Sequence, residues 1–160
     1  MLRSSDANPA PTRMAYWLFQ GNPKYYRVLD ALRDYQQMPW LTTRYAKDLA
    51  LGDEVIVWLA GPAAGIYALA TIAELPRLRP DPPDRDYWLD KSRIGSKPQA
   101  LLQFTQKFLQ QPLLRPALKQ DPVLQHLLVL RAPNSTNFKV TLEQWQRVQA
   151  LVPAKQSEPD

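Results

Sequence analysis

Hydrophobic residues follow two different periods along this chain, one typical of strands and the other typical of helices. Residues 15–20 form an aromatic and apolar run that ends in a Gly-Asn-Pro turn, which predicts a buried strand. Between residues 24 and 38 the apolar positions recur at helical spacing, with charged residues between them. This spacing predicts an amphipathic helix that ends before Pro39, because proline restricts the residue that precedes it.

Three further runs are typical of strands. Residues 54–59, 66–74 and 100–109 are rich in aliphatic or aromatic side chains. The first two are separated only by a short loop with Gly61 and Gly65, which predicts an antiparallel hairpin. Both faces of 66–74 are mostly apolar or small, so we expect this strand to lie at the centre of a sheet.

The remaining segments are short, apart from a final helix. Thr141 and Gln144 have the spacing of a capping box, which predicts a helix over 142–152 that buries Leu142, Trp145 and Val148. We further expect an extended piece at 40–43, a short helix at 44–50 capped by Thr43, helical turns at 116–120 and 122–127, and a brief strand at 128–130. Five or six strands interspersed with three or four helices, without a regular alternation, predict an α+β fold.

Composition narrows the possible functions. The chain has 160 residues, no cysteine, one histidine (His126) and a net charge of +5. One domain is expected, with disordered tails at 1–13 and 153–160. Thiolate chemistry is excluded, and no glycine-rich nucleotide-binding motif is present. With neither a long apolar run nor a signal-peptide pattern, we expect a cytoplasmic protein.

A long proline-containing connection, 76–98, carries the most uneven charge. It begins with acidic residues, and six basic residues without an acidic one follow between Lys91 and Lys119. Aspartates beside a lysine are also found in metal-dependent nucleases, where carboxylates hold Mg²⁺. Here the aspartates stand in a proline-rich loop, and Asp90 directly precedes Lys91, which favours a solvated loop. The basic stretch suits contacts with phosphates.

Aromatic and amide side chains outside the regular elements are the best candidates for binding. Recognition of an unstacked base needs flat aromatic walls and a few amides that can pair with the base edge. Trp40, Trp58, Asn22 and Asn137 have this chemistry, although tryptophans more often pack in a core. Trp17 and Trp145 are assigned to the core by the strand and helix patterns. The lone His126 stands beside an apolar run, which favours a structural role.

Five segments follow one another in a characteristic order and spacing. They are Met14–Pro23 (MAYWLFQGNP), Trp40–Tyr45 (WLTTRY), Gly52–Trp58 (GDEVIVW), Gly61–Ala68 (GPAAGIYA) and Ser135–Trp145, which contains STNFKVT and EQW. Together they resemble the EVE domain of the PUA-like superfamily over residues 14–152. The resemblance implies a curved, barrel-like mixed sheet of five to six strands with flanking helices.

The resemblance also implies a pocket related to that of YTH domains, which hold a modified base in an aromatic cage. EVE domains are associated with modified bases in DNA, notably methylated or hydroxymethylated cytosine. The residues assigned to the pocket by position are Asn22, Trp40, Leu41, Thr42, Trp58, Gly61, Asn137 and Phe138. We predict phosphate contacts from Arg44, Lys91, Arg93, Lys97 and Arg131.

These observations predict a non-catalytic reader module that binds nucleic acid carrying a modified base. It would use no cofactor and no metal, favour DNA over RNA, and rely on a separate restriction or effector protein for any cleavage. Two alternatives stay open. One is a metal-dependent nuclease or other hydrolase that uses the Asp81–Asp90 cluster, with Asp84, Asp86 and Asp90 as ligands. The other is a protein-interaction module without a ligand.

Overall fold

A curved, mixed sheet of seven strands forms the centre of the computed structural model, which describes residues 14–153. The strands are β2 (Tyr16–Gly21), β3 (Gln37–Leu41), β4 (Glu54–Leu59), β5 (Gly65–Arg77), β6 (Gln99–Lys107), β7 (Leu113–Leu114) and β8 (Asn137–Val140). Their order is β3-β6-β5-β4-β2-β8, with β7 paired to β5. Only the β2–β4 pair is parallel among these described strands. The expected hairpin, the central position of β5 and the α+β class are confirmed.

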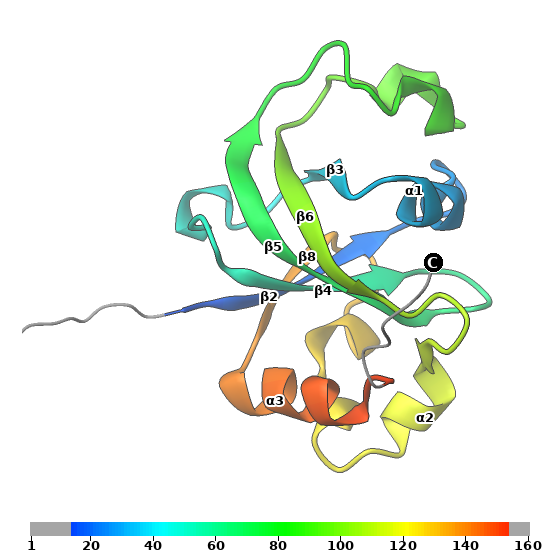
Figure 1. The fold of residues 1–160 in the computed structure, drawn as a ribbon, viewed down its shortest axis with the longest axis vertical. Helices are drawn as coiled ribbons and strands as arrows, with labels where there is room; N and C mark the ends of the chain where they lie inside the picture. Colours follow the sequence, from blue (N-terminus) through cyan, green and yellow to red (C-terminus); the bar gives the residue numbers. More distant parts are fainter. Residues whose placement is uncertain (1–13, 154–160) are drawn as a thin grey trace, which may run out of the picture.

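Helices cover both sides of this sheet (Figure 1). The α-helices are α1 (Val28–Asp34), α2 (Arg115–Lys119) and α3 (Leu142–Leu151). The 3-10 helices are η1 (Ala46–Asp48), η2 (Arg85–Tyr87), η3 (Lys91–Arg93), η4 (Leu124–His126) and η5 (Leu128–Leu130). In Figure 1, α2 and α3 lie on one side of the sheet, whereas α1 and the connection that carries η2 and η3 lie on the other.

The alternation of side chains along each strand divides the apolar residues between two cores. In β2, Trp17 and Phe19 enter the core on the α1 side, while Leu18 enters the core that packs against α3. Trp145 of α3 is buried in this second core, so the assignment of Trp17 and Trp145 to the core is confirmed. The capping box at the start of α3 is also present.

The predicted helix over 24–38 is mostly wrong, because α1 spans only Val28–Asp34. Residues before it have extended backbone, since Tyr26 forms a β-bridge with Trp88 and Arg27 N donates to Tyr87 O at 2.8 Å. After α1 the chain enters β3 at Gln37, and Pro39 lies within this strand. Proline fits there because β3 is at the edge of the sheet.

Other differences concern short segments. The expected strand at 128–130 is the 3-10 helix η5, and the expected helix at 44–50 is reduced to η1. Strand β5 continues past residue 74 to Arg77, so the long connection spans 78–98. Leu142 is exposed, because it is the first residue of α3 and lies outside the buried face. The predicted tails at 1–13 and 154–160 lie outside the described residues.

One buried amide joins the two edge strands of the sheet. The Asn137 side chain, at the start of β8, is fully buried. Its Nδ2 donates to Leu41 O at 3.0 Å, and its Oδ1 accepts from Thr43 N at 2.8 Å and from Arg44 N at 3.2 Å. Leu41 ends β3, so the amide connects the opposite edges of the sheet and closes its curve.

We expect Asn137→Ala to destabilise the fold by about 3 kcal/mol, because three hydrogen bonds are lost and their backbone partners are left unpaired. Urea unfolding followed by tryptophan fluorescence measures this change. Asn134→Ala, in the exposed loop before β8, is the matched control and is expected to have a near-zero effect. Equal stability of the two variants would contradict the closing role of Asn137.

Candidate functional site

A cavity of about 370 Å³ lies where the end of β2, the chain before α1, strand β3, the 78–98 connection and the loop before β8 meet. Aromatic rings and polar side chains share its wall. The residues that line it are Gln20, Gly21, Asn22, Tyr25, Tyr26, Val28, Met38, Pro39, Trp40, Leu41, Trp88, Arg93, Gln99, Pro133, Asn134, Ser135 and Thr136. This volume lies within the range of small-molecule sites.

The Trp40 side chain forms a fixed wall of the cavity. It is 5% exposed, and its Nε1 donates to Gln20 O at 3.2 Å. Its ring lies so close to Gly21 that an added Cβ would stand 2.9 Å from Trp40 Cζ2. Glycine is therefore required for β2 and β3 to approach at this point, and the ring is held in one orientation.

A second wall consists of Tyr26 and Trp88, which come from segments far apart in the sequence. Their rings meet edge to face, with centroids 4.9 Å apart. Leu89 N donates to Tyr25 O at 2.8 Å, next to the bridge between Tyr26 and Trp88. The 78–98 connection is thus anchored to the chain before α1 by backbone hydrogen bonds as well as by aromatic packing.

Asp84 holds Tyr26 from behind. The Tyr26 hydroxyl donates to Asp84 Oδ2 at 2.5 Å, and this carboxyl group is only 1% exposed. Its other oxygen has no hydrogen-bond partner among the described residues. Burial raises the pKa of the Asp84 carboxyl, and burial together with the neighbouring Asp84 raises the pKa of Tyr26.

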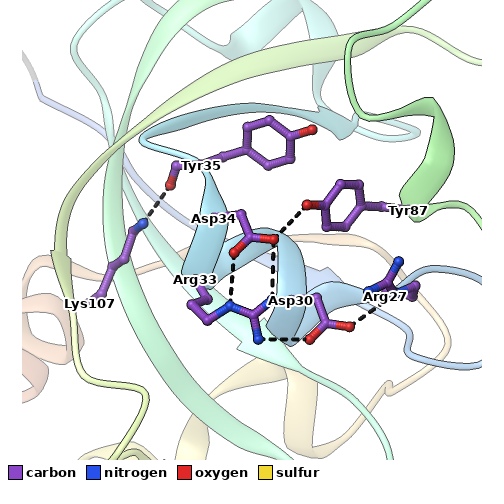
Figure 2. A network of polar contacts seen from close by, with 7 residues as sticks. All are labelled: Arg27, Asp30, Arg33, Asp34, Tyr35, Tyr87 and Lys107. Carbon is purple, nitrogen blue, oxygen red and sulfur yellow. Dashed lines mark hydrogen bonds and ion pairs between the residues drawn. The ribbon is translucent and has the colours of Figure 1, made fainter.

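A polar network on the outer side of α1 anchors the same connection (Figure 2). Asp34 accepts hydrogen bonds from Arg33 at 2.8 Å and from the Tyr87 hydroxyl at 2.5 Å. The bond to Asp34 raises the pKa of Tyr87 to about 12, so this hydroxyl remains a donor at neutral pH. Because Tyr87 directly precedes Trp88, the network helps to position the second wall.

The structure brings together three residues of the predicted pocket, since Asn22, Trp40 and Leu41 all line the cavity. Trp58 and Phe138 instead pack in the core on the α3 side of the sheet. Their strand positions point them to the opposite face from Trp17 and Phe19.

The other three predicted pocket residues have structural contacts. Thr42 is buried, and its hydroxyl donates to Trp40 O at 3.3 Å. Gly61 has a φ of +99° and forms the turn beside Pro23. The amide of Asn137 is fully engaged with the backbone around β3, so it has no polar atom left for a ligand.

The predicted phosphate contacts are dispersed. Arg93 lines the cavity, with its guanidinium 3.6 Å from the centre of the Tyr25 ring. Lys91 is bound by the carbonyl oxygen of Trp88, and Arg131 lies 3.2 Å from His126 Nδ1. Arg44 lies over the Tyr45 ring, and Lys97 is exposed just before β6.

The basic stretch from Lys91 to Lys119 does not form one surface. Lys107 is half-buried, and its Nζ donates to Tyr35 O. Arg115 and Lys119 belong to α2, on the side of the sheet opposite η3 (Figure 1). Only the first part of the stretch is therefore near the cavity.

Sequence reasoning missed Tyr26, Trp88 and Gln99 as cavity residues. Tyr26 stood in a predicted helix, Trp88 in a long connection and Gln99 at the start of a strand, so no local pattern distinguished them. The available signal was the concentration of aromatic residues at 87–88, within an otherwise polar loop.

The aspartates of the 78–98 connection have separate environments. Asp84 is bound to Tyr26, Asp86 is exposed, and Asp90 accepts from Ser92 Oγ and Arg93 Nε at 2.5 and 3.2 Å. Within residues 14–153, no three acidic or histidine side chains gather closely enough to hold a metal ion. Across the same span, no helix has the length and apolar composition needed to cross a bilayer.

The raised pKa of Asp84 predicts a pH-dependent effect of Asp84→Asn. A carboxyl group whose pKa is higher in the folded state supports folding below its unfolded pKa of 3.8, and this support is lost as pH rises. The asparagine keeps an oxygen for Tyr26 without a buried charge. We therefore expect its melting temperature, relative to the unaltered protein, to be higher at pH 7 than at pH 4. A difference independent of pH would contradict this assignment.

Comparisons with known proteins agree with this architecture. The model of the EVE domain family matches residues 15–151. A comparison with curated proteins found no significant match. Among solved structures, a protein from Pseudomonas putida is 25% identical; the match covers 86% of this chain and 99% of that chain, with a TM-score of 0.64.

Two more distant structures share the fold. Human THYN1, in complex with DNA containing 5-methylcytosine, is 14% identical with a TM-score of 0.63, and the match covers 91% of this chain and 99% of that chain. The YTH domain of Zygosaccharomyces rouxii MRB1, in complex with N6-methyladenosine RNA, is 15% identical with a TM-score of 0.52, covering 98% and 95%. Because the family model spans most of the sequence and the sheet has the expected form, this chain belongs to the EVE domain family.

Proposed function

We propose that this protein is a non-catalytic reader that holds a modified base, flipped out of its strand, in the cavity beside Trp40. The observation that carries the proposal is a cavity of about 370 Å³ whose wall combines four aromatic residues with polar groups. Aromatic faces stack on bases, and polar groups beside them recognise the base edge. The four aromatic residues are Tyr25, Tyr26, Trp40 and Trp88.

The structural relatives support this reading. THYN1 was solved with DNA containing 5-methylcytosine, and the YTH domain with N6-methyladenosine RNA. Both ligands carry a base enlarged by one methyl group. We extend this chemistry to the present chain and favour methylated or hydroxymethylated cytosine in DNA, with any cleavage carried out by a separate effector protein.

The energetics require contacts outside the cavity. Stacking contributes about 1–3 kcal/mol per base, whereas extrusion from the duplex costs a few kcal/mol. The cavity alone would therefore bind weakly, and cations at its rim must hold the phosphates. Arg93 and Lys24 suit this role, because both are exposed and both lie over the Tyr25 ring at the cavity.

The first test compares binding of oligonucleotides that differ only in one base, cytosine or 5-methylcytosine, by fluorescence anisotropy. We expect tighter binding of the modified strand and a loss of about 1–3 kcal/mol in Trp40→Ala, the contribution of one stacked base. Trp58→Phe, altered in the core on the α3 side, serves as the control.

Because Trp40 is itself nearly buried, its variant must be checked by circular dichroism, and Trp40→Phe provides a second variant that keeps a ring. Equal affinity for both strands, together with unaltered binding by folded Trp40→Ala, would rule out the proposed site.

A second test concerns salt. Removing one phosphate contact lowers the slope of log affinity against log salt by about 0.9 for a duplex. We expect this change for Arg93→Ala, and no change for Lys119→Ala on the opposite side of the sheet. Measurements from 50 to 200 mM salt would decide it, since an identical slope for both variants would exclude Arg93 as a phosphate contact.

A further inference from the structure

Two polar atoms beside the cavity are buried and have no hydrogen-bond partner. They are Gln99 Oε1 and Trp88 Nε1, in side chains that line the cavity and are 3% and 6% exposed. Buried polar atoms in proteins are nearly always paired, so an unpaired one needs an explanation. Two of them in the wall of one cavity indicate that a ligand supplies the missing partners.

The two atoms have complementary chemistry. An indole N–H can only donate a hydrogen bond, and an amide oxygen can only accept one. The cavity therefore offers one donor and one acceptor, beside the flat face of Trp40. A planar ligand that carries an N–H next to an acceptor atom would satisfy both.

Both side chains are held by the fold before any ligand arrives. Gln99 begins β6, where its backbone pairs with Leu41 on one side and with Arg77 on the other. Trp88 is fixed by its bridge to Tyr26 and by the edge-to-face contact between the two rings. Groups positioned in advance lose little freedom on binding, which favours specificity.

Two other polar side chains in the wall are already engaged. Gln20 Nε2 donates to the carbonyl oxygens of Pro133 and Ser135, at 2.8 and 2.7 Å. Asn22 Oδ1 accepts from Lys24 N at 2.9 Å. These contacts shape the loops around the cavity, whereas the unpaired atoms of Gln99 and Trp88 remain available to a ligand.

We propose that Gln99 and Trp88 read the edge of the bound base, with Gln99 Oε1 accepting from a base N–H and Trp88 Nε1 donating to a neighbouring acceptor. This inference rests on the proposed function and makes it more specific. A methyl group on a ring carbon leaves such an edge intact, and an amino group with one methyl still has one N–H. An amino group with two methyl groups has none, so the site would reject it.

The test combines changes in the protein with changes in the probe. The probes are single-stranded oligonucleotides carrying 5-methylcytosine, N4,N4-dimethylcytosine, N6-methyladenine or N6,N6-dimethyladenine at one position. The variants are Gln99→Met, which removes the acceptor at similar size, and Trp88→Phe, which removes the indole N–H but keeps a ring. Gln103→Met on the same strand and Trp58→Phe in the other core are the matched controls.

We expect each of the two variants to bind the preferred probe about tenfold more weakly, as for the loss of one hydrogen bond. The unaltered protein should also lose about tenfold when the amino group of that probe is dimethylated, whereas Gln99→Met should lose little more. Gln99→Glu keeps an acceptor and should retain the discrimination. Melting temperatures establish that each variant is folded, and Gln99→Glu keeps the test decisive if Gln99→Met is not.

Two outcomes would overturn the inference. If the unaltered protein prefers a modified base but Gln99→Met and Trp88→Phe keep its affinity and discrimination, these residues do not read the base. If dimethylation weakens Gln99→Met as much as the unaltered protein, the effect is steric. By contrast, no preference for any modified base, together with unaffected Trp40→Ala, would show that the proposed function itself has failed.

Discussion

The hydrogen bonds of one buried amide determine the shape on which the rest of this molecule depends. Asn137 connects β8 to the end of β3, the opposite edges of the sheet. An open sheet would leave those backbone groups unpaired and would separate the walls of the cavity. The closure places Trp40 against Gly21, where only a glycine leaves room for the indole ring. The asparagine thus acts through architecture, because both ends of its amide are occupied.

The cavity exists because a long connection returns to the chain before α1. Backbone bonds near Tyr25, the buried contact between Tyr26 and Asp84, and the network around Asp34 in Figure 2 hold it there. This anchoring has a cost, since a carboxyl group is buried without a cation. It also leaves polar atoms of Gln99 and Trp88 unpaired in the wall. Such strain at a preformed cavity is typical of sites that complete their hydrogen bonds on binding a ligand.

The accuracy of sequence-based prediction differed between regular elements and connections. Strands β4 and β5 were predictable because their apolar residues alone require burial on both faces, and α3 because its capping box is local. The helix predicted over 24–38 failed because Tyr26 pairs with Trp88, a contact between residues far apart in the sequence. Trp58 was expected in the pocket, yet the register of β4 directs it to the other core, which residue type does not reveal.

The sequence by itself determined the family, the α+β class, most strands and the importance of Trp40, because these depend on local pattern and on motifs in a fixed order. Only the tertiary structure decided which polar groups are free. Asn137 and Gln99 carry the same amide group, but the first is saturated by the backbone of β3 and the second has an unpaired oxygen beside the cavity. The difference arises from partners brought together by folding, and the hydrogen-bonding capacity of a residue does not specify them.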